Sequence, residues 1–512
     1  MKSTGYAGFA VLLFALTAGP ASTTLQAHAG PAGQARSEAR QPGTSTLLAL
    51  QPCQIEHPSR LMVITAECGT LQVPENPAQP RGRQIGLYVA RVPAINRRKA
   101  QDPLFLLAGG PGGSAVDMYA GTAPAFERIH RDRDIVLLDQ RGTGKSNPLT
   151  CDFDPDALVT ASDDVVQTET RRCLDTIRQH ADVAFYTTSI AVEDLDRVRA
   201  ALGYESINLY GASYGTRVAQ HYVRRFPTRT RAVILDGVVP PQLALGPSLA
   251  LDAEKALTAV LARCAGDAAC QARFGDPATT YLALRKSLKE RPVSVSLPDP
   301  TTGEPEHLEF SSEHLATVLR LAIYSADQAA LLPLALDRAG KAGDFVPLAG
   351  QFLLMSHAFE DMLAFGMHNS VVCAEDVPFF PAADEIDRVA MEGTFLGTAP
   401  VDSLSNLCKV WPRGPADADL HEPLETSVPV LLLSGGNDPV TPPAYAEEAR
   451  KSMKNNLHIV IPGLGHGQIV APCIDDVLAR FLDSGTTVNL DVSCTRDVKP
   501  MPFFTTLAGP PP

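Results

Sequence analysis

Short apolar runs alternate with amphipathic helical patterns along most of the chain. The apolar runs predict β-strands at 61–65, 85–92, 103–108, 135–138, 207–210, 232–235, 428–433 and 458–461. The intervals between them carry helical patterns, and in 190–202 the apolar residues fall near one face of a helix. Further helices are predicted over 214–225 and 474–482. Such alternation is typical of a mostly parallel sheet covered by helices, so the predicted class is α/β.

One long interval breaks this alternation. After the sixth predicted strand, helical patterns with few strand signals continue to residue 428, most clearly at 249–261, 315–323, 329–336 and 345–365. A segment inserted there would cover the C-terminal ends of the parallel strands, where α/β sheets bind ligands. We therefore predict a large, mainly helical cap inserted after strand 6. The expected domains are the core in two parts, 51–240 and 426–512, with the cap at 241–425.

The first residues have the pattern of an export signal. Lys2 precedes an apolar stretch at 6–18, and Ala27-His28-Ala29 offers a cleavage site between small residues. We predict a signal peptide over 1–29 and a flexible leader over 30–50. The alternative is an uncleaved N-terminal anchor, but the stretch is short for a bilayer span. No other window reaches that apolar length, so we expect a secreted or periplasmic protein without stable membrane insertion.

The cysteines agree with export. The chain has 10 of them, and in sequence order they form the local couples Cys53–Cys68, Cys151–Cys173, Cys264–Cys270, Cys373–Cys408 and Cys473–Cys494. Oxidising compartments favour disulfides, so pairing between sequence neighbours is our hypothesis, although the sequence allows other connectivities. Neither a CxxC pair nor a His/Cys metal spacing occurs, and we expect no metal ion and no cofactor.

Charge and motif chemistry exclude two classes of partner. The formal net charge is -13 and the pI is about 5.4, whereas nucleic-acid binding needs a basic surface. The longest basic cluster, 97–99, is predicted to be a solvated turn. Residues 142–146 resemble the end of a phosphate-binding P-loop, but the full pattern requires glycine where this chain has Asp139. We therefore expect neither a nucleic-acid nor a nucleotide partner. No pattern specifies an oligomeric state.

A nucleophile motif lies between a predicted strand and a predicted helix. Gly211-Ala212-Ser213-Tyr214-Gly215 matches G-x-S-x-G, which is a weak signal alone. In this context it predicts a nucleophile elbow with Ser213 at its tip, because the sharp turn admits only small residues two positions before and after the serine. The alternative is an ordinary glycine-rich turn. The helix that follows would direct N–H groups and a positive dipole end at a developing oxyanion.

A serine hydroxyl needs a base, and the base needs a carboxylate. Of the 12 histidines, we favour His466, which lies in a glycine-rich loop directly after the last predicted strand. Asp438 follows the strand at 428–433 and is the favoured acid. The competing acid is Asp236, after the strand at 232–235, which we expect to be a loop or helix-cap residue instead. The chain order Ser213, Asp438, His466 is that of the α/β-hydrolase fold.

The oxyanion hole needs backbone donors near the serine. Ala108 to Ser114 follows the strand at 103–108 and contains four glycines, which tolerate the unusual backbone angles of such a loop. The predicted donors are the Tyr214 N–H and one N–H from Gly109 or Gly110. A simple glycine turn is the alternative.

Taken together, the motifs resemble a known family. They are Gly109-Gly110-Pro111-Gly112-Gly113, the segment 139–146 (Asp-Gln-Arg-Gly-Thr-Gly-Lys-Ser), the elbow 211–215, the segment 436–442 (Gly-Asn-Asp-Pro-Val-Thr-Pro) and Gly465-His466-Gly467. This set is similar to that of the secreted proline iminopeptidases and tripeptidyl aminopeptidases, and 408–494 resembles the C-terminal region of the latter. Proline iminopeptidases usually have histidine before the first glycine of the oxyanion loop, where this chain has Ala108, so the resemblance favours the tripeptidyl branch.

The resemblance implies an enzyme that removes residues from a free peptide N-terminus. Such an exopeptidase must hold an ammonium, for which a buried carboxylate is the natural partner. The segment 370–376 resembles a Cys-x-Glu/Asp segment that faces the site in relatives, which makes Glu375 the candidate ligand and Asp376 the second; an ordinary surface pair or cap salt bridge is the alternative. The expected substrate is a peptide or a small ester. A carboxylesterase with the same triad is the runner-up, and a catalytically inactive binding protein is a further alternative.

Overall fold

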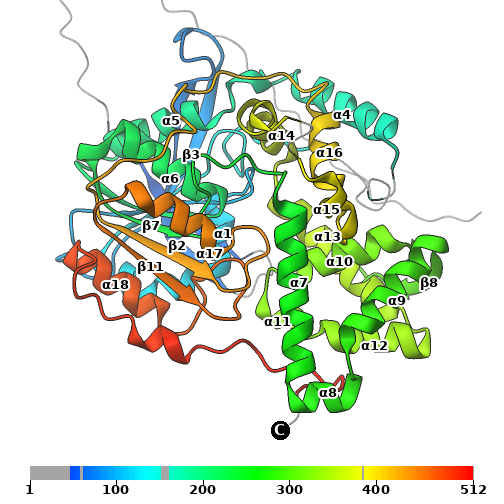
Figure 1. The fold of residues 1–512 in the computed structure, drawn as a ribbon. Coiled ribbons are helices and arrows are strands. Elements are labelled where there is room, and N and C mark those ends of the chain that lie inside the picture. Colours follow the sequence, from blue (N-terminus) through cyan, green and yellow to red (C-terminus); the bar gives the residue numbers. More distant parts are fainter. Residues whose placement is uncertain (1–46, 58–61, 152–158, 160, 383–385, 511–512) are drawn as a thin grey trace, which may run out of the picture. The chain divides into compact units, whose positions relative to one another are not determined.

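A nine-stranded sheet forms the centre of the core in the computed structural model (Figure 1). The structure describes residues 47–57, 62–151, 159, 161–382 and 386–510, so the predicted signal peptide and the leader up to residue 46 lie outside it. In spatial order the strands are β1 (Gln51–Glu56), β2 (Val63–Pro74), β3 (Gln84–Val92), β5 (Ile135–Leu138), β4 (Leu104–Leu107), β6 (Ile207–Ala212), β7 (Thr230–Asp236), β10 (Val430–Gly435) and β11 (Asn456–Ile461).

The sheet is antiparallel at one edge and parallel elsewhere. The pairs from β1 to β5 are antiparallel, and every pair from β5 to β11 is parallel. The strands β4, β5 and β10 are buried at every position, because helices cover both faces of this part of the sheet. This mostly parallel sheet confirms the predicted fold class.

Helices pack on both faces of the sheet. One face carries α5 (Thr188–Ala201), α6 (Tyr214–Arg225) and α17 (Pro443–Ala449). The other carries α1 (Ala115–Thr122), α2 (Glu127–Asp132) and α18 (Ile474–Ser484). Figure 1 shows α18 on the opposite side of the strands from α6. Each face thereby buries its own hydrophobic cluster, and strand residues alternate between the two clusters.

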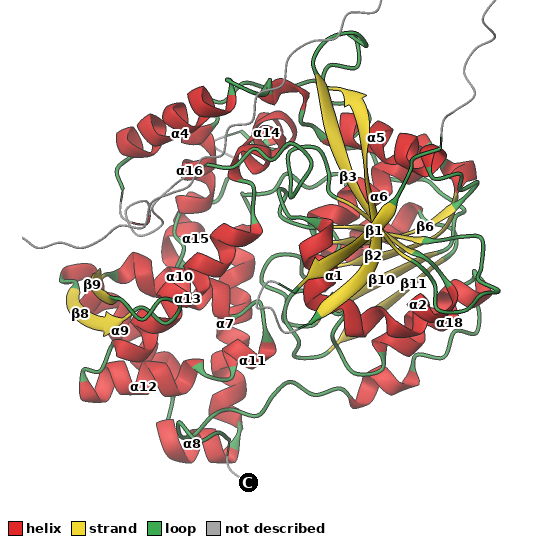
Figure 2. Ribbon diagram, turned by 180° about the vertical axis from the view of Figure 1, so that it is seen from behind, coloured by secondary structure: helices red, strands yellow, loops and turns green. Residues whose placement is uncertain are grey.

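The segment between β7 and β10 is mainly helical. Its helices are α7 (Leu249–Gly266), α8 (Ala268–Phe274), α9 (Pro277–Glu290), α10 (Ser312–Ala322), α11 (Ala326–Ala329), α12 (Leu332–Ala342), α13 (Val346–Met362), α14 (Phe365–Glu375), α15 (Arg388–Gly393) and α16 (Ala399–Leu407). Helices α7 to α13 share a separate hydrophobic cluster. In contrast, α14 packs with the core helices and α4 (Asp163–Ile177). Figure 2 shows the α7–α13 group beside the sheet rather than on its helical layers.

The structure adds strands that the sequence did not reveal. β1 is an edge strand in which only Ile55 is buried, so it lacks an apolar run. Within the cap, β8 (Val293–Pro298) and β9 (Pro305–Phe310) form a two-stranded hairpin of mostly exposed residues. Because β1 precedes the strands that were predicted, the cap follows the seventh strand of the chain rather than the sixth.

The covalent links agree with the cysteine pattern. All ten cysteines lie in the described residues and form five disulfides between sequence neighbours, which confirms the pairing hypothesis. No helix in the described part of the chain is both long and apolar enough to cross a membrane.

The end of the chain returns to the cap. After α18, the C-terminal segment runs across to the helices near α8 and α11, drawn in red in Figure 1. Phe503 is buried in the cap cluster, and the Phe504 N–H donates to the Ala330 carbonyl (3.1 Å). The division at 240/241 and 425/426 remains a prediction, and this segment ties the two predicted parts together.

Candidate active site

Ser213 occupies a strained turn between β6 and α6. Its backbone angles are φ 53° and ψ -122°, a region that costs a non-glycine residue about 1–3 kcal/mol. A Cβ on Gly215 would lie 2.2 Å from the Leu107 carbonyl oxygen, and a Cβ on Gly211 would lie 2.4 Å from the Gly215 carbonyl oxygen. Glycine is therefore required at both positions, which is the geometry of a nucleophile elbow.

Asp438 and His466 form a hydrogen-bonded pair beside this edge of the sheet. The His466 Nδ1 lies 2.8 Å from Asp438 Oδ2. The other bonds to the carboxylate come from the turn that follows it: the backbone N–H groups of Val440 (2.9 Å) and Thr441 (2.8 Å) and the Thr441 hydroxyl (2.8 Å). Asp438 is therefore fully satisfied and held in one orientation, with the imidazole as one of its partners.

This pair has the electrostatics that a general base requires. Burial alone lowers the pKa of His466, but the charge and hydrogen bond of Asp438 outweigh it and raise the pKa above its usual 6.5. Burial raises the pKa of Asp438, but the His466 charge and hydrogen bond and the backbone N–H groups of Thr441 and Val440 hold it below its usual 3.8. The carboxylate stays ionised and stabilises an imidazolium when one forms.

Ser213 and His466 both lie against the end of β7. The Ser213 N–H donates to the Asp236 carbonyl (2.8 Å), and a Cβ on the next residue, Gly237, would lie 2.9 Å from His466 Cε1. Among the described residues, no hydrogen bond joins the Ser213 hydroxyl to His466. Hydrogen bonds between a nucleophile and its base are often long in the absence of substrate. The roles proposed for Ser213 and His466 therefore rest on their shared location at the end of β7.

The glycine loop after β4 lies directly against Ser213. A Cβ on Gly109 would lie 3.0 Å from Ser213 Cβ and 3.7 Å from its hydroxyl oxygen. Tyr214 is the first residue of α6, so its N–H has no acceptor within the helix. Gly110 has φ 113°, which glycine adopts readily. Gly109 and Tyr214 therefore lie at the elbow, and Gly110 follows Gly109 in the same loop. The role of all three as oxyanion donors remains a prediction.

The segment 139–146 contacts the residues that follow this glycine loop. The Asp139 carboxylate accepts the Ser114 hydroxyl (2.8 Å), the Val116 N–H (3.2 Å) and the Lys145 N–H (2.9 Å). Burial raises its pKa. The segment 139–146 thus binds its own carboxylate, Asp139, through the Lys145 N–H. The same carboxylate also binds the start of α1, immediately after the glycine loop.

Glu375 and Asp376 are both fully buried at the end of α14. Asp376 pairs with Arg217 (2.9 Å), so a cation already neutralises it. Glu375 accepts hydrogen bonds from the N–H (2.6 Å) and the hydroxyl (2.7 Å) of Thr188, and that hydroxyl also contacts the Tyr214 hydroxyl (2.6 Å). Burial raises the pKa of Glu375 to about 7, although Arg217 and the Thr188 hydrogen bonds oppose the shift.

Sequence reasoning missed two residues that hold the loop of His466, Asp236 and Tyr324. Asp236 is neither a loop nor a cap residue: it ends β7, and its carboxylate accepts the backbone N–H groups of Gln468 and Ile469. The cap contributes Tyr324, whose carbonyl accepts the His466 N–H (2.7 Å) and whose ring packs edge-on against the imidazole. Nothing local in the sequence connects these residues to the histidine, although an aspartate at a strand end was a visible signal.

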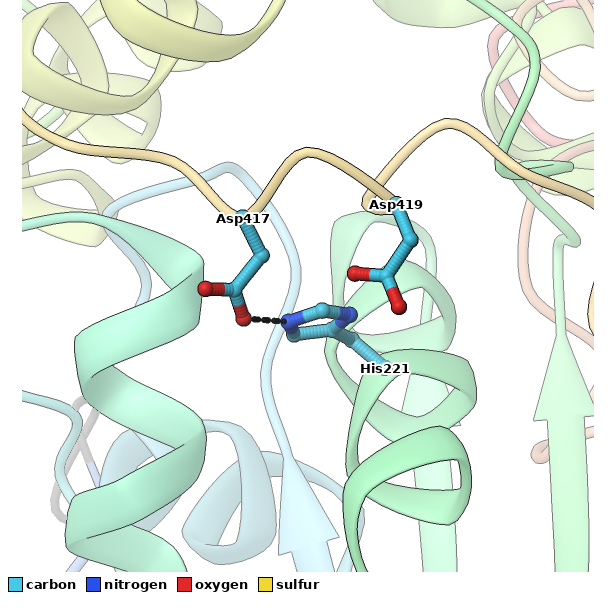
Figure 3. Close-up of side chains that lie close together, drawn as sticks. All are labelled: His221, Asp417 and Asp419. Carbon is cyan, nitrogen blue, oxygen red and sulfur yellow. Dashed lines mark hydrogen bonds and ion pairs between the residues drawn. The ribbon is translucent and has the colours of Figure 1, made fainter.

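A second cluster of ionisable groups lies at the far end of α6 (Figure 3). The His221 Nε2 lies 2.8 Å from Asp417 Oδ2, and Asp419 faces the same ring from the other side. Arg225 pairs with both carboxylates, at 2.6 Å each. Since a guanidinium already supplies the cation, we assign this cluster to holding the segment between α16 and β10 on α6, not to a metal ion.

Comparisons with known proteins match two parts of the chain to family models. Residues 102–269 match the alpha/beta hydrolase fold, and residues 394–494 match the model described as TAP-like protein. The first match contains Ser213, and the second contains Asp438 and His466. The three residues predicted from motif order therefore lie within matched segments.

Curated relatives span most of the chain. Carboxylesterase B of Mycobacterium tuberculosis is 30% identical over 471 residues, which cover 84% of this chain and 86% of the relative. Serine protease Hip1 of the same species is 28% identical and covers 86% and 90%. Tripeptidyl aminopeptidase of Streptomyces lividans is 27% identical and covers 85% of each.

Proposed function

Because this chain belongs to the α/β-hydrolase family and is a serine hydrolase, we propose that it is an exported exopeptidase that cleaves residues from the free N-terminus of peptides. Ser213 acts as the nucleophile, His466 as the base and Asp438 as the acid that orients it. The observation that carries the proposal is the 2.8 Å contact between His466 and Asp438, at the end of β7 that also holds the Ser213 backbone.

The proposed reaction has two stages. His466 removes the proton of the Ser213 hydroxyl as the serine oxygen attacks the substrate carbonyl. The oxyanion that forms accepts hydrogen bonds from the N–H groups of Tyr214 and the Gly109–Gly110 loop. The protonated imidazole then gives its proton to the leaving amine, and an acyl-enzyme remains. Water activated by the same imidazole releases the acyl group.

Glu375 is our proposed ligand for the substrate ammonium, with Asp376 second. Two observations favour Glu375: its partners are neutral groups of Thr188, whereas Asp376 is already paired with Arg217. Because both Glu375 oxygens are buried and occupied, an ammonium reaches the carboxylate only if Thr188 gives way or the side chain turns. Glu375→Gln is expected to weaken peptide hydrolysis far more than hydrolysis of an uncharged ester; equal losses on both remove Glu375 from this role.

A carboxylesterase is the second candidate function, since one relative bears that name. The deciding experiment compares aminoacyl and tripeptidyl amides with N-blocked amides and simple esters on the purified mature protein. Selective hydrolysis of amides with a free N-terminus supports the exopeptidase. Rapid turnover of esters with none of the amides supports the esterase instead.

Export is proposed from the disulfides and the leader pattern. Five disulfides form and persist in oxidising compartments and are rare in the cytosol. N-terminal sequencing of the protein recovered outside the cytoplasm should begin near residue 30, after the predicted cleavage site.

A further inference from the structure

Asp236 binds backbone N–H groups beside both reacting side chains of the proposed site, through two different groups. Its backbone carbonyl accepts the Ser213 N–H at 2.8 Å. Its carboxylate accepts the Gln468 N–H at 2.8 Å and the Ile469 N–H at 2.9 Å, two and three residues after His466. One residue at the end of β7 therefore connects the nucleophile elbow to the histidine loop.

The surrounding contacts extend this connection. The Tyr210 hydroxyl, from the strand that leads into the elbow, donates to Asp236 Oδ2 at 2.8 Å. The Gln468 side chain donates to the Gly465 carbonyl at 2.8 Å, which closes the loop around His466. Asp236, Tyr210 and Gln468 are all at most 1% exposed, so water does not compete for these bonds.

Asp236 also adds a negative charge near the imidazole. The charged groups facing His466 are Asp438, bonded to its Nδ1, and Asp236, whose charge further favours the protonated ring. The Tyr324 ring is a neighbouring neutral group. Burial raises the pKa of Asp236 to about 6, against the opposing effect of its hydrogen bonds, so the carboxylate is ionised at neutral pH.

We infer that Asp236 is a positioning residue for the reaction: its carboxylate fixes the loop that carries His466 to the same strand end that fixes Ser213. It is not the acid of the triad, because His466 Nδ1 bonds Asp438 instead. This inference rests on the proposed function, since it assigns a role only if Ser213 and His466 react together. Displacing the loop by about 1 Å would cost on the order of a hundredfold in rate.

The test compares Asp236→Asn and Tyr210→Phe with a matched control, Tyr222→Phe. Tyr222 is equally buried and its hydroxyl donates to a different aspartate, Asp196, so the control removes a buried tyrosine–aspartate bond away from the histidine loop. Rates are measured on a substrate amide and on an ester across pH 5–9, together with thermal unfolding.

Asp236→Asn is expected to lower kcat by on the order of a hundredfold on both substrates with KM nearly unchanged, and to move the acid limb of kcat/KM to lower pH. Tyr210→Phe should change kcat and the acid limb in the same direction but by less. Tyr222→Phe should leave kcat and the acid limb unchanged. A folded Asp236→Asn enzyme with wild-type kcat and acid limb overturns the inference. It is also overturned if all three variants lose kcat in proportion to the drop in their unfolding temperatures. If Asp236→Asn does not fold, Tyr210→Phe decides by the same readouts.

Ser213→Ala in the same assay distinguishes a wrong role for Asp236 from a wrong nucleophile. If Ser213→Ala is inactive and Asp236→Asn is wild-type, the proposed nucleophile stands and the role of Asp236 is wrong. If Ser213→Ala retains turnover, the proposed function itself fails.

Discussion

Three buried carboxylates, Asp438, Asp236 and Glu375, have different pKa values because their partners differ. Asp438 faces the imidazole and three donors from its own turn, and its pKa is low. Asp236 binds backbone N–H groups and a tyrosine, and its pKa rises to about 6. Glu375 binds one threonine, and its pKa rises to about 7. Environments that separate the pKa values of neighbouring acids are the usual mark of divided roles.

Asp438→Asn tests the acid of the proposed triad. The variant should lower kcat by on the order of 10⁴-fold, because an amide can no longer hold the imidazole in the required tautomer. Activity needs neutral His466, so the wild-type rate falls as the pH drops through the raised His466 pKa, and that limb should move to lower pH in the variant. Retention of more than a tenth of the wild-type kcat would contradict the assignment.

Glu375→Gln makes a stability prediction that is independent of substrate. The folded pKa of Glu375 is about 7 against an ordinary 4.5, so between these values the folded state holds a proton that the unfolded state has released. The free energy of unfolding contributed by this group is therefore present below pH 4.5 and lost as the pH rises through about 7. Glu375→Gln has no titrating group at this position and does not lose this contribution. Its free energy of unfolding relative to wild type should therefore rise by about 3 kcal/mol from pH 4.5 to 8. Urea unfolding at several pH values measures it, and a constant difference contradicts it.

At the scale of elements, the cap reaches the active site through the connection between α10 and α11. Tyr324 lies in this connection, and its backbone carbonyl holds the His466 N–H. Its ring centroid is 5.4 Å from that of His466, at an interplanar angle of 77°. The cap thus contributes a residue that helps to orient the base.

Tyr324→Ala should therefore lower kcat/KM by about tenfold or more, since the imidazole loses the ring that limits its motion. Tyr324→Phe keeps the ring and serves as the control, with activity near wild type. Steady-state kinetics on a small substrate would measure the effect. Equal activity of the alanine and phenylalanine variants would show that the ring contact is unimportant.

At the scale of the whole molecule, the C-terminal segment that contains Phe503 packs against the cap and stabilises it. Phe503 is 4% exposed within the cap cluster, and the Arg263 guanidinium lies 4.0 Å from its ring centroid. The same arginine donates to the Met501 carbonyl (3.0 Å). A segment that follows the last core helix thereby stabilises helices from the middle of the chain.

Phe503→Ala should lower the free energy of unfolding by about 3–5 kcal/mol, the usual cost of removing a buried phenylalanine. Leu507 lies on the same segment but is 74% exposed, so Leu507→Ala should change stability by less than about 0.5 kcal/mol. Denaturant unfolding and limited proteolysis of the cap would compare the two. Similar stability of both variants would show that the segment does not fasten the cap.

The sequence by itself determined the parts of this protein whose signal is local. β4 and β10 are buried on both faces and so appear as continuous apolar runs, and the elbow is visible because two glycines must flank Ser213 at close range. The disulfides join cysteines that are neighbours in sequence. The polar edge strand β1 and the exposed hairpin of β8 and β9 bury too little to leave such a pattern.

Only the tertiary structure decided which side chains meet. Asp236 ends β7 and Asp438 lies in the turn after β10, so the two looked alike as candidates. The fold brings the Asp236 carboxylate to the backbone of Gln468, 232 residues away, and the imidazole of His466 bonds to Asp438 instead. Tyr324 reaches His466 from an inserted cap in the same way. Contacts of this kind depend on the relative placement of elements far apart along the chain, which no local pattern of residues encodes.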